Sequence, residues 1–273
     1  MRLGVSSSMG AVNAGEWAKI NRELGLKTVV FPLDSTAPES QINEYVKAAK
    51  ENDLTIAEVG IWRNAIARDA KEAKENLEYS IRQLLLADRI KARCAVNVAG
   101  AYTGERWDGP HRDNFSKECF EKTVKMIQTV IDEAKPENTY MTIEPMPWML
   151  PTGPKEYLKL IDAVERDRFA VHMDIINMIN SAERYFYSTE FLEECFELLG
   201  DKIKSCHLKD ITLLQDFTFQ LKECACGEGS FNIERYAELA SNLDPDMPMI
   251  IEHLKADSQY LESVSYVRKR LKI

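Results

Sequence analysis

The sequence alternates eight short apolar runs with eight segments of helical periodicity. The runs, each expected to form a β-strand, cover residues 3–7, 28–31, 54–59, 92–98, 140–144, 169–174, 203–207 and 249–252. The helices are expected over 16–24, 38–52, 69–90, 116–134, from 153–154 onward, and over 189–199, 232–241 and 257–271. Strands that alternate with helices pair in parallel, because each helix carries the chain back across the sheet. Eight such units predict a closed (β/α)8 barrel, or TIM barrel, an α/β fold of about 250 residues.

An open, doubly wound parallel sheet is the alternative arrangement of the same units. That fold usually has a glycine-rich turn after its first strand. Here the turn reads Ser6-Ser7-Ser8-Met9-Gly10 and lacks the G-x-G-x-x-G pattern. No low-complexity segment or linker divides the chain of 273 residues. We therefore expect a single barrel domain over residues 1–273.

Composition argues against several classes of partner. The net charge is −9, with 44 acidic and 35 basic residues, and no basic block offers a surface for nucleic acid. No apolar run approaches the roughly 20 residues of a membrane span, and the N-terminus lacks the pattern of a signal peptide. Six scattered cysteines predict reduced thiols. We expect a cytoplasmic protein, and the sequence leaves its oligomeric state open, a homo-oligomer included.

Each of the last four strands ends on a residue that can bind a metal: Glu144, Asp174, His207 and Glu252. Side chains alternate between the two faces of a strand, and in each run the ligand falls on the more polar face. The carboxyl ends of parallel strands meet at one rim of a barrel, where barrel enzymes place their active sites. Any one of these residues alone would be interpreted as a salt-bridge or core residue. Four such residues at the corresponding ends of four strands predict a metal site.

Three carboxylates and one imidazole favour Mn²⁺, and also suit Mg²⁺, Co²⁺, Fe²⁺ or Zn²⁺. Four protein ligands leave two positions of an octahedron for neighbouring oxygens of a carbohydrate. Such chelation acidifies the adjacent C–H group and stabilises an enediolate. Glu144 and Glu252 flank the other two ligands, so that one can remove a proton and the other return it.

Further residues are candidates for contacts with a small carbohydrate substrate. Lys209 shares a face with His207 and is expected at the pocket mouth or in contact with Asp210. His172, on the face of Asp174, either orients that residue, touches substrate or belongs to the core. Glu58 points into the barrel, where a carboxylate needs a partner.

Two loops add aromatic and polar candidates. Trp107 and His111 lie in the long loop after the fourth strand, and Trp148 follows Glu144 in a proline-rich segment. Tryptophan faces stack on sugar C–H groups, whereas the Asp-Gly-Pro sequence beside Trp107 is equally typical of a surface turn. The backbone amides of Gly227-Glu228-Gly229 could bind an anion. The segment lacks a phosphate-binding signature, however, so a flexible turn is favoured there.

The motifs around these residues resemble the xylose isomerase-like TIM barrels, the sugar phosphate isomerase/epimerase superfamily. The matching runs are Thr142-Ile143-Glu144-Pro145, Val171-His172-Met173-Asp174, Ser205-Cys206-His207-Leu208-Lys209-Asp210 and Ile250-Ile251-Glu252-His253. The resemblance implies one divalent metal held by Glu144, Asp174, His207 and Glu252. In ketose 3-epimerases of this group, the two glutamates are also the acid–base pair.

Two departures separate this chain from the ketose 3-epimerases. Asn177 stands where those enzymes carry a substrate-binding histidine, which makes it the corresponding contact candidate here. The stretch 211–223 lacks the arginine that they place after the metal-binding histidine. The superfamily also contains inosose and dehydroshikimate dehydratases and hydroxypyruvate isomerase.

The sequence therefore favours a metal-dependent sugar isomerase or epimerase that moves a proton next to a carbonyl through an enediolate. The alternative is a metal-dependent dehydratase, or lyase, of a keto-sugar or keto-cyclitol. An AP endonuclease is disfavoured, because that reading requires three metals and about five histidine ligands, and the chain has four histidines. A non-catalytic sugar-binding subunit would need the metal site to be vestigial.

Overall fold

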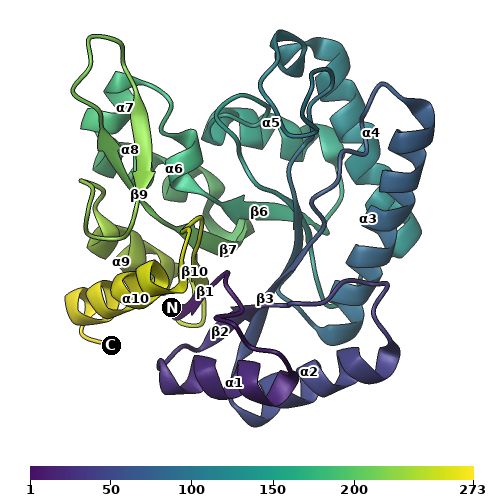
Figure 1. Cartoon of the computed structure of the whole chain (residues 1–273). Helices are drawn as coiled ribbons and strands as arrows, with labels where there is room; N and C mark the ends of the chain where they lie inside the picture. The colour runs from purple at the N-terminus through teal and green to yellow at the C-terminus, as the bar shows by residue number, and fades with distance from the viewer.

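The computed structural model describes residues 1–273, and its centre is a barrel of parallel strands surrounded by helices (Figure 1). The barrel strands are β1 (Arg2–Val5), β2 (Thr28–Val30), β3 (Thr55–Gly60), β4 (Cys94–Asn97), β5 (Met141–Ile143), β6 (Phe169–Met173), β7 (Ile203–Leu208) and β10 (Pro248–Ile251). They pair in parallel in the order β1-β10-β7-β6-β5-β4-β3-β2. The predicted (β/α)8 barrel is confirmed.

The barrel is nearly closed at the seam between β1 and β2. These strands lie side by side without a continuous ladder, and one backbone bond joins Lys27 N to Leu3 O at 2.9 Å. Gly4 allows the close approach, because a Cβ at this position would overlap the carbonyl oxygen of Thr28. A larger residue would force the seam apart.

The helices surround the strands (Figure 1). The long ones are α1 (Ala14–Glu23), α2 (Glu39–Glu51), α3 (Ala70–Ile90), α4 (Lys117–Ala134), α5 (Pro154–Val164), α8 (Ser188–Leu199), α9 (Ile233–Leu243) and α10 (Asp257–Leu271). Short helical turns are α6 (Ile175–Met178), α7 (Ala182–Phe186), η1 (Arg112–Phe115) and η2 (Gly200–Lys202). As predicted, Ser116 caps α4 by accepting a hydrogen bond from Cys119 N, and Pro154 opens α5. None of the helices combines the length and apolar character that a membrane span requires.

A hydrophobic core of 62 buried residues holds the helices against the barrel. Helix α4 shows how the sequence builds this contact. Its buried residues Thr123, Ile127, Val130 and Ala134 recur at intervals of three or four, which places them on one side of the helix. This packing on the outer faces of the strands holds the strands in place, so the residues at their ends have defined positions.

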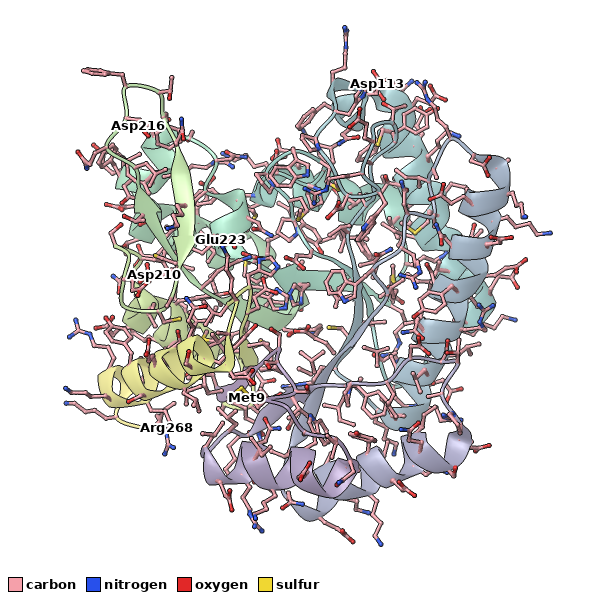
Figure 2. All side chains as sticks on the ribbon, in the orientation of Figure 1. Met9, Asp113, Asp210, Asp216, Glu223 and Arg268 are labelled. Atoms are coloured by element: carbon pink, nitrogen blue, oxygen red, sulfur yellow. The ribbon has the colours of Figure 1, made fainter.

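The long segment after β7 contains a hairpin that the sequence did not predict. Strand β8 (Asp210–Leu213) pairs antiparallel with β9 (Leu221–Cys224). The hairpin stands on one side of the barrel, with Asp216 at its tip, and Asp113 marks the β4–α4 loop on the other side (Figure 2). These two segments provide opposite sides of the candidate site.

Candidate metal centre

Four side chains that could bind a metal meet at the carboxyl ends of neighbouring strands. Glu144 directly follows β5, Asp174 follows β6, His207 lies near the end of β7, and Glu252 follows β10. Because β5, β6, β7 and β10 are consecutive in the sheet, the four ends lie side by side. One ligand atom from each residue lies within 4.8 Å of the others, and all four residues are buried. The structure thus brings together the four ligands that the sequence predicts.

The imidazole of His207 directs Nδ1 at the three carboxylates. Nδ1 lies 2.9 Å from Glu252 Oε1, 3.6 Å from Glu144 Oε1 and 3.9 Å from Asp174 Oδ2. Despite these short distances, neither His207 Nδ1 nor Asp174 Oδ2 makes a hydrogen bond of acceptable geometry. Buried polar atoms normally have a partner. His207 Nδ1, without a hydrogen-bond partner inside a buried set of three carboxylates, fits a divalent cation. Asp174 Oδ2 is balanced by the ammonium group of Lys209 at 2.7 Å.

The two glutamates of the centre have opposite electrostatic environments. Burial, reinforced by the nearby Glu252 carboxylate, raises the pKa of Glu144 to about 7. Burial also acts to raise the pKa of Glu252, but the charges of His207 and Lys209 outweigh it and hold that pKa well below its ordinary value. One buried carboxyl group therefore holds its proton more tightly than the other.

Lys209 supplies a buried positive charge beside the ligands. Its Nζ lies 2.7 Å from Asp174 Oδ2 and 2.8 Å from Glu252 Oε1, and Glu223 of the hairpin lies at 3.1 Å. Burial lowers the pKa of Lys209, but Asp174 and Glu252 outweigh it and hold the pKa well above its usual value. The expected position at the pocket mouth is wrong, because Lys209 is 2 % exposed and does not line the main cavity.

The alternative contact between Lys209 and Asp210 is not formed either. Asp210 Oδ2 accepts hydrogen bonds from the amides of Gly227 and Gly229, and Oδ1 accepts them from the amides of Ile211 and Phe231. The turn at 227–229 is therefore pinned rather than loose. Its amides bind the chain's own carboxylate.

Asn177 connects the ligands to one another. Its Nδ2 donates to Glu144 Oε1 at 2.9 Å, and its Oδ1 accepts from Lys209 Nζ at 3.2 Å. Its backbone N–H also donates to Asp174 Oδ1 at 3.0 Å. The residue lines the cavity and also orients Glu144.

Glu58 and His172 lie inside the barrel, as their strand faces predict. Glu58 accepts hydrogen bonds from Ser205 Oγ at 2.6 Å and from His207 Nε2 at 3.3 Å. The ring of His172 packs edge-on against His207, with centroids 4.0 Å apart, and neither ring nitrogen has a hydrogen-bond partner. Burial lowers the pKa of His172 to about 4. His172 makes no hydrogen bond to Asp174 and does not reach the cavity, so the structure places it in the barrel core.

A cavity of about 1010 Å³ opens above the four ligands. Its lining includes Glu58, Glu144, His207 and Glu252 at the base and two of the predicted aromatic residues, Trp107 and Trp148. The predicted candidate His111 is not part of the lining. It caps η1 instead, where Nδ1 accepts a hydrogen bond from Asp113 N at 3.2 Å, so the local turn chemistry decides its position.

Sequence reasoning missed several residues of the cavity lining. The main ones are Trp62, Phe219, Leu221, Glu223 and His253. Trp62 and His253 each lie two residues after the end of a strand, a position that could have identified them. The other three belong to the β8–β9 hairpin, and Glu223 is seen on β9 facing the centre of the molecule (Figure 2).

The fold is a (β/α)8 barrel, and it carries a buried group of four residues that could hold a metal ion. The family model of the xylose isomerase-like TIM barrel matches residues 18–270, and the chain belongs to this family. No curated protein matches the sequence.

Solved structures of similar fold include enzymes of different reactions. A xylose isomerase-like TIM barrel protein from Mycobacterium smegmatis in complex with magnesium has a TM-score of 0.69 at 18% identity, over 96% of this chain and 90% of that one. D-psicose 3-epimerase with D-tagatose from Clostridium cellulolyticum H10 has a TM-score of 0.72 at 12% identity, over 99% of both chains. The probable 3-DHS dehydratase from Bacillus anthracis, involved in petrobactin synthesis, has a TM-score of 0.73 at 16% identity, over 100% and 99%. At these identities the likeness establishes the fold.

Proposed function

We propose that this protein is a divalent-metal-dependent sugar isomerase or epimerase that transfers a proton at a carbon next to a carbonyl. The observation that carries the proposal is the convergence of Glu144, Asp174, His207 and Glu252, with ligand atoms within 4.8 Å of one another. We assign the metal-ligand role to these four residues. A bound divalent cation would polarise two neighbouring oxygens of the sugar and stabilise negative charge that develops on them.

The chain's own side chains supply the proton transfer. Glu144 and Glu252 come from β5 and β10, on either side of the strands that carry Asp174 and His207. In this proposal one glutamate removes the proton from the substrate carbon and the other returns one to a carbon or oxygen. Asn177 holds Glu144 by its amide, and Lys209 holds Glu252 by its ammonium group. Both partners limit the carboxylates to one orientation.

The magnesium complex of the M. smegmatis protein supports a divalent metal, and the oxygen-rich ligand set suits Mn²⁺ or Mg²⁺. The epimerase with a bound ketose supports a small carbohydrate as substrate. A phosphate group has no evident partner at the turn 227–229, because the amides of Gly227 and Gly229 are bonded to Asp210. We therefore favour an unphosphorylated sugar.

A dehydratase is the second candidate, because the probable 3-DHS dehydratase matches the fold as well as the epimerase does. The same base would remove a proton, and loss of a hydroxyl group would follow instead of reprotonation. A nuclease finds less support. The group of four ligands contains one histidine, and the acidic net charge of −9 opposes a DNA surface.

The test is solvent exchange with the metal-loaded protein. Keto-sugars and keto-cyclitols are incubated in D₂O with Mn²⁺ or Mg²⁺, and deuterium at the carbon next to the carbonyl is followed by NMR. Incorporation without loss of water supports the isomerase or epimerase, whereas an ultraviolet enone absorbance supports the dehydratase. Glu144→Gln and Glu252→Gln should each abolish exchange, and Glu197→Gln on the exposed face of α8 should not. Absence of both signals with metal bound would refute the proposal.

A further inference from the structure

A small hydrophobic cluster stands at the mouth of the metal centre, separate from the main core. Its buried members are Val98, Ala99 and Met149. Trp62, Met146 and Trp148 pack against them while remaining partly exposed. Because Val98 and these three partly exposed residues line the same cavity as Glu144 and His207, the cluster forms an apolar wall continuous with the metal centre.

The two indoles of this wall are fixed by the protein itself. Trp62 has a left-handed backbone, with φ of 49°, which is unusual for a bulky residue and marks a position held by its surroundings. Its ring covers Gly60, where a Cβ would overlap the indole nitrogen. Trp148 donates a hydrogen bond from Nε1 to Asp108 O at 2.7 Å. Both rings are therefore placed before any ligand arrives.

The β8–β9 hairpin supplies further apolar surface to the same cavity. Ile211, Phe219 and Leu221 are part of the lining. Phe219 is 44% exposed, and Phe217, two residues earlier, is fully exposed and outside the lining. Figure 1 shows the hairpin standing beside the opening of the barrel, across from the segments that follow β4 and β5.

The charged residues of the outer cavity are already paired. Arg106 forms a salt bridge to Asp108 at 3.0 Å within the same loop. The outer half therefore offers aromatic and aliphatic surface with little unmatched charge, whereas the inner half offers Glu58, Glu144, His207 and Glu252. Such a division is typical of a site for a ligand with one polar and one apolar end.

The size of the cavity points the same way. A volume of about 1010 Å³ reaches the upper end of the sites that hold drug-sized ligands. A free hexose, with about twelve non-hydrogen atoms, would fill only the inner part and would leave the aromatic surface of the outer part uncovered. An apolar extension of the substrate would cover this surface.

We propose that the outer cavity is a subsite for a flat, apolar aglycone, so that the substrate is a keto-sugar carried as a glycoside rather than a free monosaccharide. The sugar part would lie on the four metal-binding residues. The aglycone would stack on Trp62 and Trp148 and contact Phe219 from the hairpin. This assignment rests on the proposed function, because it places the reacting sugar at the metal centre.

Equilibrium binding tests the subsite without requiring turnover. Phenyl and methyl β-D-glucoside share one sugar and differ in the aglycone, and their dissociation constants are measured by calorimetry with Mg²⁺ present. We expect the phenyl glucoside to bind about tenfold more tightly or better. Trp62→Ala should bring the ratio of the two constants close to one, and Phe219→Ala should reduce it severalfold.

Phe217→Ala provides the matched control, since it removes the same ring from the same hairpin outside the cavity lining and should leave the ratio unchanged. Circular dichroism of each variant separates loss of binding from loss of fold. Equal binding of the two glucosides, no detectable binding of the phenyl glucoside, or a ratio that survives both substitutions in the cavity would overturn the subsite. Failure of the proposed function appears separately, as absent deuterium exchange, and leaves this binding ratio intact.

Discussion

Glu58 accepts a hydrogen bond from His207 Nε2 at 3.3 Å across the interior of the barrel. A carboxylate can only accept, so this contact places a proton on Nε2 and leaves Nδ1 for the metal centre. Burial acts to raise the pKa of Glu58, but His207 and His172 outweigh it and hold that pKa below its ordinary value. Glu58 is therefore the ionised partner that orients the ring of His207.

Replacing Glu58 should weaken metal binding without removing a ligand. Outer partners of metal-binding histidines typically contribute about 10–100-fold in affinity, so we expect Glu58→Gln to raise the dissociation constant for Mn²⁺ by roughly tenfold or more. Calorimetric titration of the metal-free protein measures the change. Thr142→Val is a suitable control, because Thr142 is equally buried and bonds to Ala95 O instead of His207. An unchanged affinity in Glu58→Gln would mean that other contacts suffice to orient the ring.

Adding a divalent metal should stabilise the folded protein. At a free metal concentration one hundred times the dissociation constant, binding adds about 2.7 kcal/mol to the free energy of unfolding. For a chain of 273 residues this corresponds to a rise in melting temperature of roughly 5–10 °C. Differential scanning calorimetry with and without EDTA measures it. Asp174→Asn should lose most of the rise, whereas Asp162→Asn on the exposed side of α5 should retain it.

The metal-dependent stabilisation should increase with pH, and Glu144 gives the direction. Its pKa is about 7 in the folded protein, against an ordinary value of 4.5. The folded state therefore keeps a proton that the unfolded state releases, and the resulting stability is present below pH 4.5 and lost as pH rises through about 7. A bound cation compensates the charge that then appears.

The rise in melting temperature caused by Mg²⁺ should thus be larger at about pH 8 than at about pH 5.5. Parallel calorimetric scans at the two values measure the difference. Glu144→Gln cannot ionise, so its metal-free form should lose less stability between the two values than the unsubstituted protein. A metal effect that is equal at both would show that Glu144 is already ionised in the metal-free protein.

The strand ends of the metal centre were predictable because two independent signals coincide. Each short apolar run predicts a strand, and the type of the residue at its end predicts a metal ligand. The convergence of Glu144 and Glu252 then follows from parallel pairing alone. The alternation of side chains along a strand likewise places Glu58 inside the barrel.

The partners of these residues were not predictable in the same way. Alternation along a strand gives the face of a side chain but not the residue it meets across the barrel. Ser205 and His207 contact Glu58 from positions 147 and 149 residues away. Only the closed barrel reveals these internal hydrogen bonds of Glu58. The suggested substrate contact stays a prediction, because Glu58 also lines the cavity.

The hairpin after β7 escaped prediction for a local reason. Its strands have four residues each, and the turn 214–220 contains none of the Asn-Gly or Asp-Gly pairs that announce a tight hairpin. The hairpin is specified instead by long-range contacts. The phenolic oxygen of Tyr185 in α7 accepts a hydrogen bond from Leu213 N at 3.2 Å, for example.

Asp210 should contribute strongly to stability, because it satisfies four backbone donors at once. Its carboxylate accepts from Ile211 N at 2.8 Å, Gly227 N at 3.0 Å, Gly229 N at 3.1 Å and Phe231 N at 3.0 Å, and the residue is 2% exposed. Asp210→Ala would leave these amides without partners, at a cost of about 1–3 kcal/mol for each one that water does not reach. We expect a loss of roughly 3 kcal/mol or more in the free energy of unfolding, measured by urea denaturation.

Asp216→Ala, at the exposed tip of the same hairpin, is the matched control and should change stability by less than about 0.5 kcal/mol. Asp210→Asn keeps one acceptor oxygen and should fall between the two. Equal stability of Asp210→Ala and Asp216→Ala would show that water replaces the carboxylate at the turn. A large loss confined to Asp210 would instead establish that this one side chain ties the hairpin to the segment leading into α9, and so holds Glu223 beside Lys209 at the metal centre.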